Sequence, residues 1–178
     1  MDEPVGLRLL REARAGDRAA FEALFGPLYE HGFRLALAML HDREEAEDAV
    51  QEALFNAWRK LHTFREGSNV RPWFLTVVAN RCRSVRRGRW YTVLRLPEVE
   101  PLPRMAPDDG LPHGVDLRRA LAGLPHDQRL LLVLRYYLDL PYEEVARIVG
   151  GSPQAVKSRT HRALERLRKA FQVPEVAV

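Results

Sequence analysis

The stretch PYEEVARIVGGSPQAVKSRTHRALERLRKAF, residues 141–171, decides the fold of the C-terminal part of the chain. Its first segment carries apolar residues at helical spacing, at Val145, Ile148 and Val149. Gly150 and Gly151 then interrupt the helix, because glycine accepts the left-handed backbone of a tight turn. Ser152 and Pro153 favour a new helix start, since serine can cap a free backbone N–H and proline has none to lose there. The stretch therefore predicts two helices joined by a glycine turn.

The second of these helices has one apolar and one basic side. Its apolar stripe consists of Val156, Thr160, Ala163, Leu164 and Leu167. Its opposite face consists of Gln154, Lys157, Ser158, His161 and Arg162. Between Pro153 and Phe171 there are six Lys or Arg residues against one acid, Glu165. Two helices, a short turn and a basic exposed face are typical of a helix-turn-helix.

This basic face indicates DNA binding. Lysine and arginine release counterions condensed on DNA, which gives sequence-independent affinity, while side chains near the helix N-terminus read bases in the major groove. The simpler interpretation is a solvated basic face on an ordinary surface helix, and charge alone would favour it. The glycine turn, the capped restart and the clean apolar stripe together favour DNA binding.

Composition limits the remaining possibilities. The 178 residues are 46% hydrophobic and 29% charged, with a formal net charge of +4, as expected of a globular protein with one domain or two small ones. Cys82 is the single cysteine, so an internal disulfide and a cysteine-based metal site are excluded. We expect no catalytic residue, metal or cofactor. The start MDEPVGLRLL lacks a signal pattern and no apolar run approaches membrane-spanning length, so we expect a cytoplasmic protein without membrane insertion.

The rest of the chain predicts an all-α fold, with two small helical domains joined by a proline-rich linker. Helical periodicity covers the first block, with a kink or break expected at Gly26-Pro27, a helix at about 43–61 and another from about residue 71. Between residues 89 and 115 lie Pro97, Pro101, Pro103, Pro107 and Pro112. Proline removes backbone donors and restricts its neighbour, so this stretch predicts an extended linker. The predicted domains are 1–88 and 116–178, with Asp116 as a plausible N-cap of the second.

Two further charged segments lie in the first predicted domain. Residues 42–52 hold six acids and one base, which predicts either a protein-binding face or a solubilising helix N-terminus. Residues 80–95 hold six arginines and no acid. The nearby Trp73 and Asn80 suit unstacked bases and single strands, although a core tryptophan and a basic helix end explain the pattern equally well. Two basic surfaces on two domains favour nucleic acid.

Three segments of the chain resemble those of bacterial RNA polymerase sigma factors. DREEAEDAVQEALFNAWRKLHTF is similar to their polymerase-binding segment, RPWFLTVVANRCRSVRR to their −10 recognition helix, and residues 124–171 to their −35-reading domain. With only these two domains, the chain resembles the extracytoplasmic-function (ECF, group IV) class. The resemblance implies an alternative sigma factor that binds core RNA polymerase, directs it to specific promoters and assists melting. The resemblance also implies that the protein is not an enzyme.

The resemblance implies roles for individual residues. Those expected to bind core polymerase, at the β′ clamp helices, are Asp48, Gln51, Glu52, Phe55 and Trp58. Those expected at the melted −10 element are Phe64, Arg65, Ser68, Asn69, Trp73, Asn80, Arg83, Arg86 and Arg87. Those expected at the duplex −35 element are Gln154, Lys157, Ser158, Arg159, His161 and Arg162. The β flap of the polymerase and an anti-sigma factor are further implied partners. The linker is expected to thread toward the active-site cleft and RNA exit path of the polymerase.

Two positions depart from the family pattern. Ser84 stands where the family often has Asp, which removes a local carboxylate from the basic helix, and Pro141 stands where it often has Ser.

Two other functions remain open on the residues alone. A helix-turn-helix regulator with a sensing N-terminal domain predicts a dimer that binds duplex DNA without polymerase. A recombinase or nuclease needs a nucleophile or clustered metal-binding carboxylates, and no second acidic segment stands out to join residues 42–52.

Overall fold

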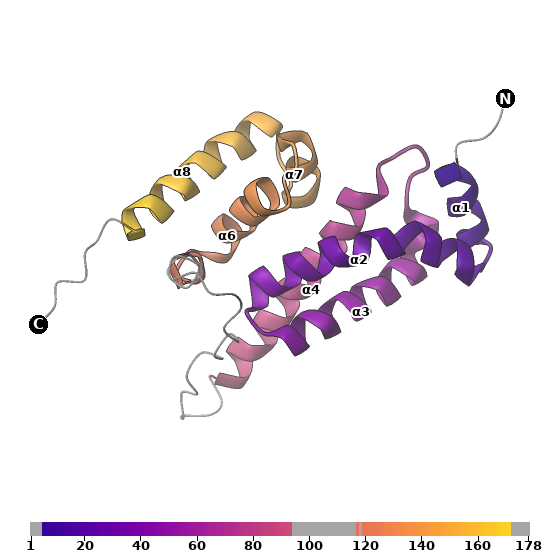
Figure 1. Cartoon of the computed structure of the whole chain (residues 1–178), viewed down its shortest axis with the longest axis horizontal. Coiled ribbons are helices and arrows are strands. Elements are labelled where there is room, and N and C mark those ends of the chain that lie inside the picture. Colours follow the sequence, from indigo (N-terminus) through magenta and orange to yellow (C-terminus); the bar gives the residue numbers. More distant parts are fainter. Residues whose placement is uncertain (1–4, 94–116, 118, 172–178) are drawn as a thin grey trace, which may run out of the picture. The chain divides into compact units, whose positions relative to one another are not determined.

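The chain forms two compact units, residues 1–103 and 104–178 (Figure 1). The computed structural model describes residues 5–93, 117 and 119–171, and within those ranges every regular element is a helix. The predicted all-α class with two helical domains is confirmed. Each unit is described by itself below.

The first unit is a bundle of four α-helices and one short 3₁₀ turn. These elements are α1 (Val5–Arg14), α2 (Arg18–Leu40), α3 (Arg43–Lys60), the 3₁₀ turn η1 (Leu61–Thr63) and α4 (Val70–Val93). Helices α2, α3 and α4 pack against one another, and α1 packs on α2. Asp17 and Asp42 begin α2 and α3 as N-caps, accepting hydrogen bonds from the Ala19 and Glu45 backbone N–H groups at 2.8 and 2.9 Å.

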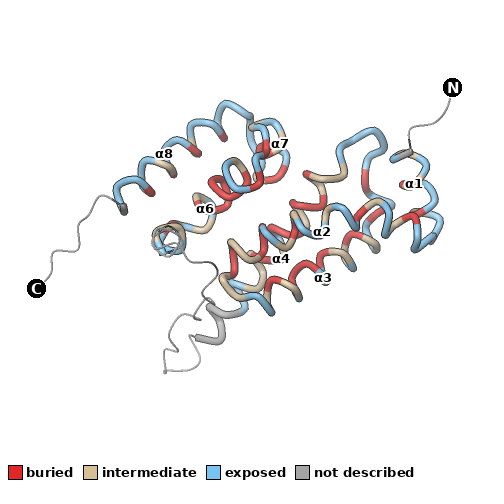
Figure 2. The backbone as a smooth tube through the Cα atoms, in the orientation of Figure 1, coloured by how far each residue is buried: buried red, intermediate tan, exposed pale blue. Residues whose placement is uncertain are grey.

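The core of this unit combines small and aromatic residues. Helix α3 has alanine at four of its five buried positions, Ala46, Ala49, Ala53 and Ala57, and valine at the fifth, Val50. Gly32 on α2 is also buried, and a Cβ placed there would lie 3.0 Å from the Phe74 ring. The close approach of α2 to α4 therefore depends on the missing side chain. In Figure 2 the buried positions follow the inward faces of these helices.

The expected break at Gly26-Pro27 is wrong, because α2 continues through Pro27, while the alternative of a kink stays a prediction. Proline removes one intrahelical bond, but both Gly26 and Pro27 lie on the exposed side of the helix. The flanking Phe25 and Leu35 are 1% and 0% exposed. Their burial holds both halves of α2 against the bundle, and we infer that this outweighs the lost hydrogen bond.

The predicted start of the linker is also wrong at its first residues. Helix α4 continues to Val93, past the expected boundary at residue 88. The first proline of the segment is Pro97, so nothing in residues 89–93 prevents a helix. The remainder of the predicted linker and the predicted N-cap at Asp116 lie outside the described residues.

The second unit contains the predicted helix-turn-helix. Its elements are α6 (His126–Leu132), the π-helical turn η2 (Val133–Tyr137), α7 (Tyr142–Val149) and α8 (Pro153–Phe171). Gly150 and Gly151 have φ angles of 79° and 102°, and the Ser152 Oγ accepts a hydrogen bond from the Ala155 N–H at 3.2 Å. The turn and the cap are therefore confirmed as the sequence predicts. Thr160 lies in the apolar stripe because its hydroxyl donates to the Val156 carbonyl at 2.8 Å.

A buried arginine ties the start of this unit together. Arg129 is 5% exposed, and its guanidinium donates to the carbonyls of Leu121, Ala122 and Leu124 at 2.9, 2.6 and 3.3 Å. These carbonyls lie at and just after the end of the helical turn at residues 119–122, where the helix no longer supplies all the donors. Arg129, which lies on α6, therefore supplies hydrogen-bond donors to the C-terminal end of the preceding helical turn.

Candidate polymerase and DNA interfaces

The predicted −35 face lies on the exposed side of α8. Gln154, Lys157, Ser158, His161 and Arg162 are exposed, and Arg159 is half-buried. Val156, Ala163 and Leu167 on the opposite side are buried, which fixes the rotation of the helix. The six predicted residues therefore lie together on and beside one solvent-facing surface of a capped helix, as a major-groove reader requires.

Local bonds hold part of this surface in place. The Ser158 hydroxyl donates to the Gln154 carbonyl at 3.1 Å, and the Arg162 Nε donates to the Ser158 carbonyl at 3.4 Å. The second bond lies along α8, so the Arg162 guanidinium keeps its other donors for a ligand. The face is exposed and positively charged before any ligand binds.

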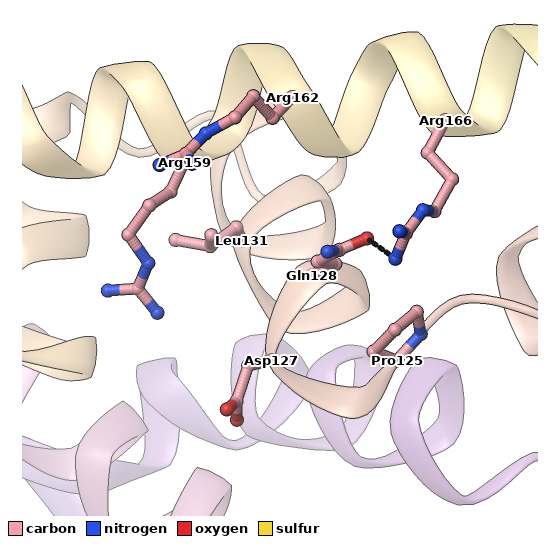
Figure 3. Close-up of a pocket in the computed structure, with 7 residues that line it drawn as sticks. All are labelled: Pro125, Asp127, Gln128, Leu131, Arg159, Arg162 and Arg166. Carbon is pink, nitrogen blue, oxygen red and sulfur yellow. Dashed lines mark hydrogen bonds between the residues drawn. The ribbon is translucent and has the colours of Figure 1, made fainter.

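A shallow pocket adjoins this face between α6 and α8 (Figure 3). It measures about 450 Å³ and is lined by Pro125, Asp127, Gln128, Leu131, Arg159, Arg162 and Arg166. The Arg166 Nη1 donates to the Gln128 Oε1 at 3.2 Å. The pocket extends the basic surface to Arg166, which the sequence prediction omitted although it follows Arg162 by one helical turn.

The predicted polymerase-binding residues lie on α3. Asp48, Gln51 and Glu52 are exposed, and Phe55 is 60% exposed, which is unusual for a phenylalanine. The Arg59 guanidinium lies 5.7 Å from the centre of the Phe55 ring. Trp58 differs from the other four, since it is half-buried and packs edge-on against Phe21 at 5.1 Å. The arrangement is an acidic surface with one apolar projection, typical of a protein-binding site.

An ion pair joins this acidic surface to the basic helix α4. The Glu52 carboxylate lies 2.5 Å from the Arg81 guanidinium, and the two side chains are 45% and 33% exposed. The two residues are 29 positions apart in the sequence, and no local pattern indicates the pairing. Part of the negative charge of α3 is therefore balanced inside the first unit.

The predicted −10 loop connects η1 to α4. Arg65, Ser68 and Asn69 are exposed, as expected of residues that meet a ligand. Phe64 is only 5% exposed, and its ring packs against Trp73 at a centroid distance of 5.3 Å. Its ring therefore anchors the loop to the core and offers no free face to a base in this structure. The Asn69 Oδ1 accepts from the Arg71 N–H at 3.0 Å and so supports the first turn of α4.

The polar side of α4 carries a chain of side-chain bonds. The Arg83 Nη1 donates to the Asn80 Oδ1 at 2.9 Å, and the Arg87 Nη2 donates to the Ser84 Oγ at 3.4 Å. Ser84 in turn donates to the Asn80 carbonyl at 3.1 Å. Ser84 thus holds Arg87 without neutralising its charge. Asn80, Arg86 and Arg87 are exposed, Arg83 is half-buried, and Trp73 is half-buried against Phe25 and Phe64.

Cys82 lies on the opposite side of α4 and is completely buried. Burial raises the pKa of its thiol to about 12, so the reactive thiolate is strongly disfavoured. Across residues 5–93, 117 and 119–171 there is no cluster of three or more His, Cys, Asp or Glu side chains able to hold a metal ion. Over the same ranges no helix is long and apolar enough to cross a membrane.

Comparison with known proteins assigns both units to one family. Residues 24–91 match the family model of Sigma-70 region 2, and residues 114–167 match that of Sigma-70 region 4. The ECF RNA polymerase sigma factor SigM of Mycobacterium tuberculosis is 32% identical over 162 residues, which cover 90% of this chain and 82% of that protein. The RNA polymerase sigma factor SigV of Bacillus subtilis is 29% identical over 76% of this chain and 81% of its own length.

Solved structures agree with this assignment. The sigma factor RpoE from Bartonella quintana, solved in complex with the anti-sigma factor NepR, aligns with a TM-score of 0.75 and 29% identity over 87% of this chain and 98% of its own. CnrH, solved with the cytosolic domain of CnrY, aligns with a TM-score of 0.74 at 22% identity, which supports the fold. With both Sigma-70 regions in the family order and a SigM-like sequence over nine-tenths of its length, the chain belongs to the ECF class of RNA polymerase sigma factors and is a transcription-initiation factor, not an enzyme.

Proposed function

We propose that the exposed side of α3 is the docking surface for core RNA polymerase, at the β′ clamp helices. The support is the combination of exposed Asp48, Gln51 and Glu52 with a projecting Phe55. Charged residues speed and orient an encounter, whereas a desolvated aromatic ring contributes most of the affinity. Trp58 supports this surface from beneath through its contact with Phe21.

The α8 face reads the −35 element as duplex DNA. Its exposed residues near the helix N-terminus are suited to base edges, and Arg162 can donate two hydrogen bonds to a guanine. Lys157 and Arg159 add contacts to phosphates, which carry affinity but little sequence information. The same domain is the proposed contact of the β flap.

The 64–69 loop and the polar side of α4 hold the melted −10 element. Taking a base out of the stack costs a few kcal/mol, which a pocket that stacks and hydrogen-bonds the base returns. Ser68, Asn69 and Asn80 supply polar groups, and Arg83, Arg86 and Arg87 supply positive charge along the strand. The factor thereby favours melted over duplex DNA, while the polymerase catalyses RNA synthesis.

Two weak DNA contacts become effective when both are held on one polymerase, because each raises the local concentration of the other. We therefore expect weak promoter binding by the free protein and strong binding by the holoenzyme. The site of action is the cytoplasm, where polymerase and chromosomal DNA meet. An anti-sigma factor is a further partner, as for the structurally similar RpoE, which was solved with NepR.

The observation that carries this proposal is the exposed, capped basic helix α8 in a chain that also has the exposed Phe55 surface. The test is promoter-dependent transcription in vitro by core polymerase with and without the purified chain. Accurate initiation only when the chain is present is the expected result. Equal specific promoter affinity with and without core polymerase would contradict it and would favour a conventional regulator.

Phe55→Ala tests the docking surface alone. Loss of a central aromatic contact should weaken core-polymerase binding by about thirtyfold, since such a residue contributes on the order of 2 kcal/mol. Tyr29→Ala is the matched control, because Tyr29 is an exposed aromatic residue on α2, outside the proposed surface. A pull-down of core subunits measures both, and equal losses in the two variants would contradict the assignment.

A further inference from the structure

The Arg14 side chain joins the end of α1 to the proposed −10 loop. Its Nε donates to the Leu61 carbonyl at 3.1 Å, one Nη donates to the Glu66 carboxylate at 2.7 Å, and the other donates to the Phe64 carbonyl. The first two partners are 47 and 52 residues away in the sequence. The side chain of Arg14 is 23% exposed, so these bonds are partly shielded from water.

The three acceptors lie at the point where α3 ends and the loop begins. Leu61 and Phe64 bracket the 3₁₀ turn η1, which a backbone bond from the Phe64 N–H to the Leu61 carbonyl closes at 3.1 Å. A carbonyl oxygen has two lone pairs, so the Leu61 carbonyl can accept a second donor, and the Phe64 carbonyl lies past the end of the turn and can take a donor from elsewhere. The guanidinium matches this need, because it offers five donors in one rigid plane.

Arg14 itself is held in place. Leu10 and Ala13 of α1 are both 3% exposed and fix the helix on the bundle. The turn after α1 is closed by bonds from the Ala15 and Gly16 N–H groups to the Arg11 and Ala13 carbonyls at 3.0 and 3.1 Å, and Gly16 has a φ of 98°. The Arg14 side chain therefore leaves a fixed point, and α1 acts as the support of the loop.

We propose that Arg14 is a positioning residue that sets −10 base selectivity by holding the 64–69 loop from α1. The proposal rests on the proposed function of that loop. Three attachments then define the loop: the Phe64 ring in the core, the Asn69 cap on α4, and the Arg14 bonds at its start. Arg65 and Ser68 lie exposed between these attachments. Their positions relative to DNA therefore depend on how firmly the attachments hold the loop. Arg14 contacts no base in this scheme.

The test uses holoenzyme assembled with the full chain and fluorescent single-stranded −10 oligonucleotides that carry the preferred base or a substituted one. Arg14→Ala should lower the ratio of the two affinities by about tenfold, since a bond to a charged group is lost and the loop relaxes. Arg14→Lys should recover only part of that ratio, because an ammonium cannot match the planar fork. Core-polymerase binding and affinity for −35 duplex should stay unchanged.

Arg8→Ala is the matched control, since Arg8 is an arginine of the same helix with a side chain 63% exposed and an ion pair at 3.8 Å to Glu12, one helical turn away. It should leave the selectivity ratio unchanged. Glu66→Gln gives a second route that leaves Arg14 in place and removes one charged acceptor, and it should reduce the ratio by less than Arg14→Ala. A selectivity loss in Arg8→Ala as large as in Arg14→Ala would overturn the inference.

Ser68→Ala separates this inference from the function on which it rests. If Ser68→Ala lowers the ratio but Arg14→Ala and Glu66→Gln do not, the loop reads the base without Arg14 and the inference is wrong. If no loop variant changes the ratio, the proposed −10 function of the loop fails, and the inference fails with it. Loss of core-polymerase binding in Arg14→Ala, with Glu66→Gln unchanged in selectivity, would mean that Arg14 supports the whole bundle and would also overturn it.

Discussion

The two proposed DNA-binding surfaces differ in how far they depend on neighbouring elements. On α8 the basic residues project from one helix, and the bonds that order them lie within that helix or reach the adjoining α6, as from Ser158 to the Gln154 carbonyl and from Arg166 to Gln128. In the first unit the bonds among Asn80, Arg83, Ser84 and Arg87 also lie within one helix. The segments around these residues, however, are tied to other elements. Arg81 of α4 pairs with Glu52 of α3, and Arg14 of α1 holds the loop at Leu61 and Phe64.

The difference follows from what each surface has to bind. Duplex DNA has a regular groove, so a rigid helix with exposed side chains can meet it without rearrangement. A flipped base needs a pocket assembled from several segments, and each segment has to be positioned by the rest of the bundle. The −35 surface should therefore respond to mutations residue by residue, and the −10 surface should respond also to changes in its supports.

The largest expected effect concerns the core beneath the −10 surface. Cys82 is fully buried and the pKa of its thiol is raised from 9.0 to about 12, so at pH 8 the folded chain should react with a maleimide at least about a thousandfold more slowly than the urea-unfolded chain. The raised pKa also means that this group favours the folded state fully below pH 9, and that this contribution declines as pH rises from 9 toward 12.

Labelling kinetics followed by mass spectrometry measure this rate for the free chain and for the holoenzyme on melted DNA. Equally slow labelling in both states is expected if the −10 surface is supported by a bundle that stays closed. Fast labelling in the holoenzyme would mean that α4 separates from the bundle when DNA binds. It would contradict the inference that the closed bundle supports the −10 surface.

The second prediction compares two arginines one turn apart on α8. Arg162→Ala should reduce discrimination between the correct and a substituted −35 base by about tenfold, because Arg162 lies on the proposed reading face. Arg166→Ala removes the same charge beside the pocket shared with Gln128 and should weaken binding to all sequences alike. Titrations of duplexes with holoenzyme at two salt concentrations separate the effects. Equal losses of discrimination would show that base reading is not confined to the predicted face.

The same contrast explains which features were predictable from the sequence. The helix-turn-helix is specified by neighbouring residues, so Gly150, Gly151 and Ser152 predict its turn and cap correctly. The exposed α8 face follows directly from the period of its apolar stripe. Helical periodicity alone does not distinguish a helix-turn-helix regulator from a sigma factor. The family resemblance makes that distinction and adds the expected partners.

The features that were not predictable depend on contacts between distant segments. The continuation of α2 through Pro27 depends on packing of Phe25 against Phe74, whose ring centres lie 5.6 Å apart at an angle of 71°. The burial of Phe64 depends on Trp73 of another element. Neither the Arg14 bonds nor the Glu52–Arg81 pair has a local signature, because each joins segments that are far apart in the sequence. Residue type, spacing and the family resemblance predict surfaces for DNA, and this stays a prediction, but they do not indicate what supports those surfaces.

The smallest expected effect concerns the ion pair between the two charged surfaces of the first unit. Glu52 and Arg81 are both partly exposed, so a double-mutant cycle with Glu52→Gln and Arg81→Ala should give a coupling of about 0.5 kcal/mol in the free energy of unfolding, measured with urea. A pair this weak leaves both residues able to exchange partners, Glu52 for polymerase and Arg81 for a DNA phosphate. A coupling above about 2 kcal/mol would instead mark the pair as a fixed structural element, since exposed pairs rarely reach that value. In that case the acidic and basic surfaces would have to be treated as one rigid unit, and Glu52 would leave the set of residues proposed to contact polymerase.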